Sequence, residues 1–220
     1  MTVGTTSEAR RIKAKPAHEP DKRERILVAA EKLFAQEGYH GVSMRDIAKS
    51  AEVGLPIIVY HFETKLNLYR SIFEFRREIM EERLNDLGKI DDFDSEDAVE
   101  RIVRAFIAPI VRSHATPEGI YHAQLVVREA SDPQEATRGI IEEYFDPLAR
   151  AFIDALRKAI PTASHEYLCW AYLFSVGALV MSDFDGRMVR ISQGKYAGIP
   201  MKKKIAMLSR YIAAGIRASS

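Results

Sequence analysis

The stretch from Ser43 to Leu68 constrains the fold of this chain more than any other. It opens with a capping box at 43–46, in which the serine hydroxyl accepts a backbone N–H and the aspartate reaches back. Gly54 then suits a tight turn, Pro56 suits the first turn of a second short helix, and Thr64 can cap a third. This order of helices and turn is the layout of a helix-turn-helix.

The second short helix, Leu55–Phe62, carries a conflicting signal. Its sequence is LPIIVYHF, and the run Ile57-Ile58-Val59 taken alone is typical of a strand. An isolated strand would have no partner in an otherwise helical chain and would leave its edge unpaired. We therefore predict a helix here, because intrinsic propensity is a weak signal that tertiary context overrides.

Most of the remaining chain has apolar residues at three- and four-residue steps, the period of an amphipathic helix. Gly38 suits the left-handed position after the first helix, which starts at Lys22, and Pro109 is expected to kink or shorten its own helix. The helices predicted after residue 64 cover about 65–84, 95–110, 117–130, 133–156, 164–184 and 201–217. The sequence therefore predicts an all-α fold with about nine helices.

Composition describes an ordinary protein with a sizeable core. The 220 residues are 47% hydrophobic and carry a formal net charge of +1, so any basic surface must be local. The single cysteine, Cys169, rules out an intrachain disulfide and favours a reducing compartment. There is no apolar signal segment, and the longest apolar run, about 170–181, is too short to cross a membrane. We expect a cytoplasmic protein without membrane contact.

Residues 1–21 contain basic residues and prolines but almost no large apolar side chains. Such a segment cannot bury enough surface to order itself, so we predict a disordered basic tail. The alternative is an arm that follows DNA phosphates or enters a minor groove.

Motifs for enzymatic chemistry are missing from the sequence. It has no glycine-rich phosphate loop, no HExxH, no paired-cysteine site and no serine elbow. His114 and His122 lie eight residues apart with no acidic ligand arranged around them. We therefore expect no catalytic residues, no metal and no cofactor.

Residues 22–72 resemble the TetR family of bacterial transcriptional regulators. The matching segments are RILVAAEKLFAQEGY, HGVSMRDIAKSAEV and YHFETKLNLY, with a lysine three residues past the phenylalanine and a tyrosine four further on. The resemblance implies a helix-turn-helix DNA-binding domain over 22–68 and a helical ligand-binding and dimerisation domain over 69–220. It implies a homodimeric repressor that a small-molecule effector releases from a palindromic DNA operator. The alternative is a helical interaction module that no longer reads DNA specifically.

The first residues of a reading helix meet base edges in the major groove. Tyr60 and His61 can also donate to phosphate, as the resemblance implies, and Ser43 and Lys65 sit at helix N-termini where phosphates bind readily. In the family a serine or threonine and a further tyrosine commonly match Ile57 and Val59, so this helix is expected to make few direct hydrogen bonds to bases. The predicted DNA-contacting residues are Ser43, Arg45, Leu55, Pro56, Val59, Tyr60, His61 and Lys65.

A ligand pocket is expected among the middle helices. Its candidate lining is Phe75, Phe106, Ile110, His114, Tyr121, Leu125, Arg128, Trp170 and Phe174. One of Arg128 and Glu129 is expected to turn inward, and a buried arginine would favour an anionic ligand; the alternative is an ion pair between an arginine and a carboxylate at the helix surface. The last two long helices are the candidates for the dimer interface. The residues expected there are Trp170, Phe174, Gly177, Ala178, Met181, Leu208, Tyr211, Ile212 and Gly215.

Overall fold

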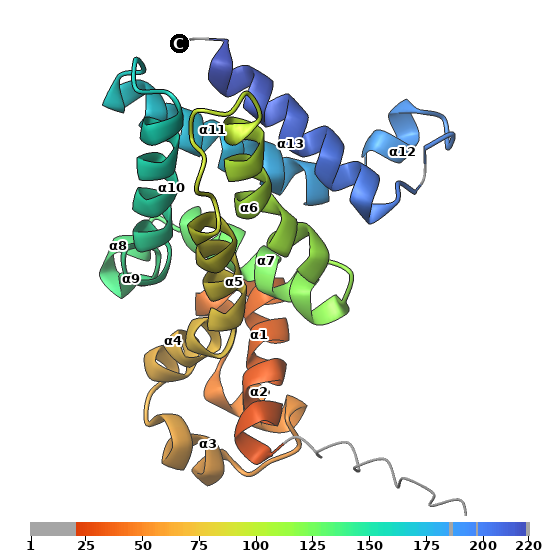
Figure 1. Cartoon of the computed structure of the whole chain (residues 1–220). Coiled ribbons are helices and arrows are strands. Elements are labelled where there is room, and N and C mark those ends of the chain that lie inside the picture. Colours follow the sequence, from red (N-terminus) through yellow and green to blue (C-terminus); the bar gives the residue numbers. More distant parts are fainter. Residues whose placement is uncertain (1–20, 185–186, 197, 219–220) are drawn as a thin grey trace, which may run out of the picture.

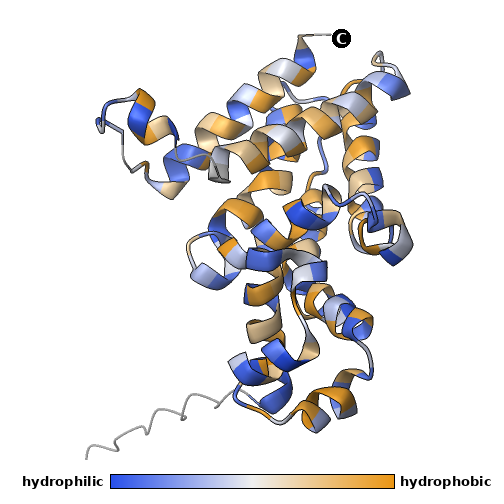
Figure 2. Ribbon diagram, turned by 180° about the vertical axis from the view of Figure 1, so that it is seen from behind, coloured by the Kyte–Doolittle hydropathy of each residue, from blue (hydrophilic) through white to orange (hydrophobic). Residues whose placement is uncertain are grey.

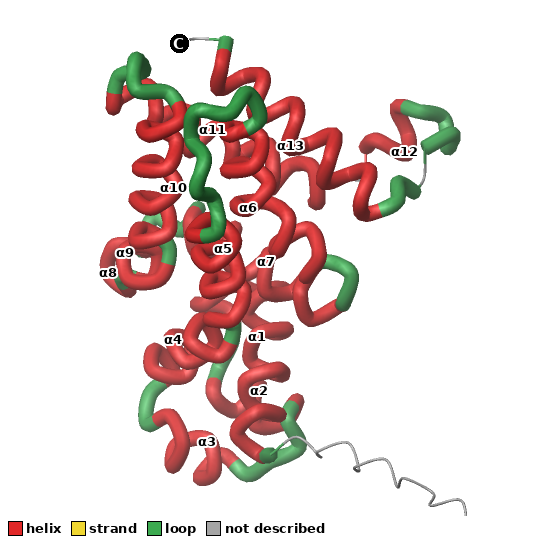
Figure 3. The backbone as a smooth tube through the Cα atoms, in the orientation of Figure 1, coloured by secondary structure: helices red, strands yellow, loops and turns green. Residues whose placement is uncertain are grey.

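The computed structural model describes residues 21–184, 187–196 and 198–218, and in these ranges it contains helices and loops but no strand (Figures 1 and 3). The predicted tail over 1–21 lies outside the described residues, apart from Asp21. The helices are α1 (Lys22–Gly41), α2 (Met44–Ser50), α3 (Leu55–Phe62), α4 (Lys65–Phe75), α5 (Arg77–Gly88), α6 (Ala98–Ser113), α7 (Pro117–Ala130), α8 (Glu135–Arg138), α9 (Ile140–Tyr144), α10 (Asp146–Ala159), α11 (His165–Phe184), α12 (Arg187–Ile191) and α13 (Met201–Arg217). The all-α prediction is confirmed.

Local signals at the start of the chain act as the sequence predicts. Ser43 and Asp46 form the capping box of α2, and the Thr64 hydroxyl accepts the Asn67 N–H at the start of α4. Gly38 has a φ of 77°, so the regular part of α1 ends there. Leu55–Phe62 is helical, which confirms the prediction made against its strand-like composition.

The described chain packs around two cores. The first joins α1–α4 and also takes in Leu125 of α7 and Ile140 of α9. The second joins α6, α10, α11 and α13. Leu68 and Tyr69 both lie in the first core, so its packing continues through the predicted domain boundary. In Figure 1 α3 lies at one end of the molecule, and α11 and α13 lie at the other.

Three predicted elements differ in the structure, which has thirteen helical segments in the described residues. The helix expected over 65–84 breaks at Arg76, and the one expected over 133–156 divides into α8, α9 and α10. Gly139, between α8 and α9, has a φ of 64°, a conformation that glycine adopts without steric cost. Pro109 does not end α6, which continues to Ser113. No helix in the described residues is long and apolar enough to span a membrane.

Candidate functional site

Helix α3 is anchored by one face and exposed on the other. Ile58 and Phe62 are buried in the first core, whereas Tyr60 is 83% exposed and Val59 46% exposed. Pro56 and His61 are also exposed, and Leu55 is half-buried against the core. Figure 2 shows this end of the molecule with an apolar helix at its tip. The exposed side therefore presents mainly apolar and aromatic groups.

The turn between α2 and α3 is held by a residue that the sequence analysis did not identify. The Arg25 guanidinium on α1 donates to the carbonyl oxygen of Ala51 at 2.9 Å and to that of Glu52 at 3.3 Å. Glu52 has a φ of 54°, a conformation that is uncommon outside glycine. No local pattern signals this contact, because its partners are 26 and 27 residues away in sequence.

Two predicted phosphate anchors are already engaged within the chain. The Ser43 backbone N–H and hydroxyl both donate to the Asp46 carboxylate, and these bonds hold the pKa of Asp46 below its usual value. The first free donors of α2 are then the backbone N–H groups that follow Ser43. The Lys65 ammonium lies 4.5 Å from the centroid of the Tyr39 ring, and partial burial lowers the pKa of Lys65. Arg45, in the first turn of α2, is exposed.

A buried carboxylate joins α1 to the middle of the chain. Glu31 is 1% exposed and accepts hydrogen bonds from Arg76 Nε, at 3.0 Å, and from His122 Nδ1, at 3.0 Å. Burial alone would raise the pKa of Glu31, but the hydrogen bonds and charges of His122 and Arg76 outweigh burial and lower it. Arg76 is the residue at which the expected long helix breaks, so this contact accompanies the α4–α5 junction.

A second buried cluster corrects the expectation for Arg128. The buried member of the pair is Glu129, which accepts hydrogen bonds from the Tyr69 hydroxyl at 2.8 Å and from Arg138 Nε at 3.0 Å. Burial and the Glu129 charge raise the pKa of Tyr69. Arg128 instead donates to the carbonyl oxygen of Gln36 on α1 at 2.9 Å. Arg128 therefore neither turns into a pocket nor pairs with its neighbour.

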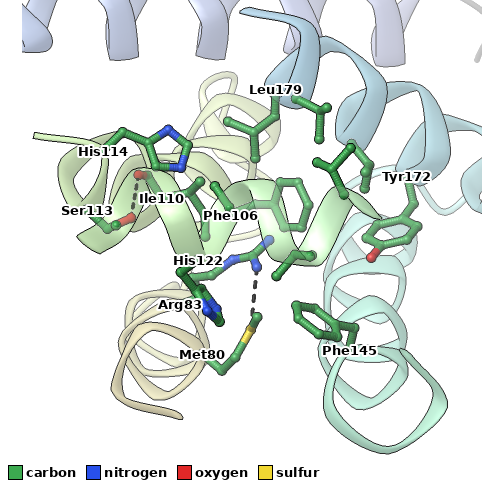
Figure 4. Close-up of a pocket in the computed structure, with 16 residues that line it drawn as sticks. Met80, Arg83, Phe106, Ile110, Ser113, His114, His122, Phe145, Tyr172 and Leu179 are labelled. Atoms are coloured by element: carbon green, nitrogen blue, oxygen red, sulfur yellow. Dashed lines mark hydrogen bonds between the residues drawn. The ribbon is translucent and has the colours of Figure 1, made fainter. Parts of the chain in front are cut away.

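A cavity of about 100 Å³ lies between α5, α6, α7 and α11, with Phe145 at one side (Figure 4). Three of the predicted lining residues reach it: Phe106, Ile110 and His114. The other six do not. Phe75, Tyr121 and Leu125 belong to the first core or pack against it, Arg128 contacts α1, and Trp170 and Phe174 are exposed on another face of α11.

Several lining residues were not predicted, among them Met80, Arg83, His122 and Tyr172. Met80 lies in the helix predicted over about 65–84, and Arg83 follows it by three residues, which places both on one helical face. That spacing is the one signal in the sequence that could have identified Arg83.

The outer faces of α11 and α13 expose large apolar side chains. Phe174 is 67% exposed, Tyr211 is 74% exposed, and Trp170 and Met181 are more than half exposed. Trp170 and Phe174 stack with ring centroids 5.8 Å apart. Gly177 and Gly215 are also exposed.

Three residues expected at this face belong at least partly to the core of the chain itself. Ile212 is buried, and Ala178 and Leu208 are half-buried and pack against the second core. Helical periodicity did not separate these residues from the outward ones, because α11 and α13 are apolar on more than one side. Leu173 and Met207, which were not predicted, are more than half exposed.

Comparisons with known proteins agree with this architecture. Residues 26–72 match the family model described as bacterial regulatory proteins, tetR family, and residues 104–215 match the tetracyclin repressor-like C-terminal domain. The chain is 37% identical over 82 residues to the HTH-type transcriptional repressor BepR of Brucella suis biovar 1. It is 37% identical over 54 residues to the HTH-type transcriptional activator FasR of Mycolicibacterium smegmatis. These matches span 37% and 24% of this chain, and 38% and 25% of the two relatives.

The fold is also that of solved structures. The fatty acid degradation regulator FadR from Bacillus halodurans superposes with a TM-score of 0.64 over 91% of this chain and 99% of that one, at 17% identity. At this identity the likeness shows the fold alone. The two family models together cover the helix-turn-helix and the helical body, and the second alone spans half of the chain. The chain therefore belongs to the TetR family of bacterial transcriptional regulators, which are DNA-binding proteins and not enzymes.

Proposed function

We propose that this protein is a homodimeric repressor that binds a palindromic DNA operator in the cytoplasm and leaves it when a small molecule fills the cavity. The observation that carries the proposal is the two-sided build of α3. Ile58 and Phe62 anchor the helix in the core, and its other face, with Tyr60 83% exposed, remains available to a major groove. We keep residues 22–68 as the DNA-binding domain and 69–220 as the regulatory domain.

We assign base contacts to the exposed residues of α3. Pro56 and Val59 can contact thymine methyl groups, and Tyr60 can reach a base edge or a phosphate. Leu55 contributes less, because it is half-buried against the core. Arg45 on α2 supplies a guanidinium at the same end of the molecule. Sequence-dependent DNA shape carries the remaining specificity.

Phosphate contacts come from the end of α3 and from the starts of the flanking helices. We assign them to His61, to Lys65 and to the first backbone N–H groups of α2 and α4. Ser43 acts as the cap that orients the start of α2, because its own donors are spent on Asp46. Tyr39, stacked under the Lys65 ammonium, restricts where that charge can point.

The dimer forms through the outer faces of α11 and α13. Phe174 and Tyr211 each leave most of their surface exposed in one copy, which is unusual for large side chains on packed helices. Gly177 and Gly215 let two copies approach closely, and two helices from each copy make a four-helix interface.

Release requires that the cavity and α3 influence one another. His122 lines the cavity with one face, and its Nδ1 donates to Glu31 of α1. Glu31 also holds Arg76 at the α4–α5 junction. A ligand that moves His122 would therefore act on both helices that flank the helix-turn-helix. Such coupling needs two states of the His122–Glu31 contact, one in which the protein binds DNA tightly and one in which it binds DNA weakly.

The direct test is binding selection from random duplexes with the full-length protein. The proposal predicts a palindromic consensus and binding that weakens steeply with salt. If no sequence is enriched and binding is only non-specific, the result would favour the alternative function, a helical interaction module. The apolar character of Pro56 and Val59 is the observation that favours this alternative. A ligand that tightens operator binding instead of weakening it would contradict repressor-type release.

A further inference from the structure

The cavity contains a buried cation. Arg83 projects from α5 and is 5% exposed, and it is the one arginine or lysine among the lining residues. The lining includes no aspartate or glutamate. Within the described part of the chain, no carboxylate forms an ion pair with Arg83, in contrast to Arg76 and Arg138.

The contacts of Arg83 satisfy its charge only in part. The guanidinium carbon lies 4.1 Å from the centroid of the Phe106 ring, a favourable cation–π distance. Nη1 donates to the Met80 sulfur at 3.5 Å, a weak acceptor, and the buried Nε donates to no acceptor in the described chain. Figure 4 shows the bond to Met80 and the side chains of α6 and α11 that surround the guanidinium.

The guanidinium keeps its charge in this setting. Burial lowers the pKa of Arg83 to about 10, which still leaves the group protonated at neutral pH. Burial raises the pKa of Tyr172 on α11, and the nearby Arg83 charge opposes this rise. A buried cation with unused donors is a costly feature unless a partner completes it.

We propose that the cavity binds a compact apolar carboxylate, whose head group takes a forked hydrogen bond from Arg83. The inference rests on the function proposed above, because it names the chemical class of the effector for the same cavity. A carboxylate matches the planar guanidinium with two parallel bonds. The apolar body then packs against Ile110, Val176 and Leu179.

Size and lining favour a carboxylate over a phosphate. A dry cavity of about 150 Å³ accepts benzene, so the present 100 Å³ suits an acid with the bulk of benzoate or of a short-chain fatty acid after a small expansion. A phosphate would meet one guanidinium and mostly apolar walls, which do not replace its hydration. The expansion is also what would displace His122 and its bond to Glu31.

The competing explanation is that Arg83 is a structural residue held by Phe106 alone. An Arg83→Met substitution separates the two. It keeps an unbranched side chain against Phe106 and removes an incompletely paired buried charge, so the ligand-free protein should be as stable as the wild type or more stable. A structural arginine would instead give a variant that melts at a clearly lower temperature.

The experiment measures binding to the full-length protein without DNA, by calorimetry and thermal shift. The probes are benzoate, the straight-chain acids from butyrate to decanoate, the neutral primary amide of each acid and the cation benzylamine. We expect at least one carboxylate to bind about tenfold or more tightly than its amide, the ratio that a charge-assisted hydrogen bond supports. Arg83→Met should abolish that preference. The control Arg112→Met, which removes an exposed arginine paired with Glu82, should retain it.

Four results would overturn the inference: no carboxylate binds, carboxylate and amide bind equally, Arg83→Met keeps the preference, or Arg83→Met without ligand melts at a clearly lower temperature than the wild type. These failures are distinguishable from failure of the proposed function. Selection of palindromic DNA without carboxylate binding would support the proposed function and contradict the proposed effector class. Carboxylate binding without sequence-selective DNA binding would support the effector class and contradict the proposed function.

Discussion

Glu31 is a residue through which widely separated parts of the chain are joined. It lies on α1, 45 residues from Arg76 and 91 residues from His122, and it holds both through one buried carboxylate. A buried carboxylate is stable only when such partners surround it, and removing the charge leaves Arg76 without its counterion.

We predict that Glu31→Gln lowers the free energy of unfolding by about 3 kcal/mol at pH 7, the usual scale for breaking a buried pair. The pKa of Glu31 is lowered on folding from its ordinary 4.5, so its stabilisation is present above that value and is lost as the pH falls through the lower folded pKa. The difference between wild type and variant should therefore shrink below about pH 4.5. Urea denaturation across pH measures this.

The matched control is Glu74→Gln, which breaks the exposed pair with Arg77 at 2.7 Å. It should cost less than about 1 kcal/mol, because exposed pairs are screened by water. Equal losses for the two variants, or a Glu31→Gln loss that persists unchanged at pH 3, would contradict the role given to Glu31.

At the scale of elements, the helix-turn-helix depends on a bond from outside it. Arg25 ties α1 to the turn between α2 and α3 through the carbonyl oxygens of Ala51 and Glu52. We predict that Arg25→Gln lowers operator affinity about tenfold and lowers the free energy of unfolding by about 1 kcal/mol, since it removes two hydrogen bonds, one of them part-buried, that orient α3. Fluorescence anisotropy on a selected duplex and thermal melting measure the two effects.

A comparison with Arg23→Gln sharpens this prediction, because Arg23 contacts the Phe62 ring rather than the turn. That variant should lose less affinity than Arg25→Gln. If Arg25→Gln binds its duplex like the wild type, the turn does not need this bond.

Helix α4 supplies the second element-scale prediction. Lys65→Ala should weaken binding to all duplexes alike and reduce the slope of log affinity against log salt by about 1, because one phosphate contact is lost. Salt titrations on a selected and a scrambled duplex measure it. Lys89→Ala, at the end of α5, should change neither the affinity nor the salt slope. A Lys65→Ala variant that loses only the preference for the selected duplex would make Lys65 a base-reading residue.

The local sequence predicted the elements whose determinants are themselves local. The capping box at 43–46 and the Thr64 cap specified α2 and the start of α4, and they outweighed the β-branched run in α3. The break at Arg76 could not be predicted in this way, because the partner of Arg76 is on α1. The same limit applied to the cavity. Helical periodicity identified Phe106 correctly, but it assigned Trp170 and Phe174 both to the pocket and to the dimer face, and it could not show that they lie outside the cavity.

At the scale of the whole molecule, α3 lies at one end, and α11 and α13 lie at the opposite end (Figure 1). A dimer joined through α11 and α13 would present two copies of α3 to one side of a duplex. This arrangement requires that the apolar α11–α13 face be covered by a second copy.

Phe174→Glu should convert the dimer to a monomer, because a charge replaces an apolar ring that is 67% exposed in one copy. The free energy of unfolding of the monomer should change by about 0.5 kcal/mol or less, since Phe174 lies outside the core. Sedimentation velocity measures the oligomeric state. Tyr196→Glu, at a similarly exposed tyrosine outside α11 and α13, should stay dimeric. A wild type that sediments as a monomer would remove the interface.

The central claim is that one dimer places two α3 helices in major grooves on the same side of DNA. Hydroxyl-radical footprinting on a selected duplex tests it most directly. The account predicts two protected windows related by a dyad, with centres about 34–36 Å apart or a multiple of that, and loss of both windows in Phe174→Glu. A single window, or two windows that persist in a monomeric variant, would contradict it.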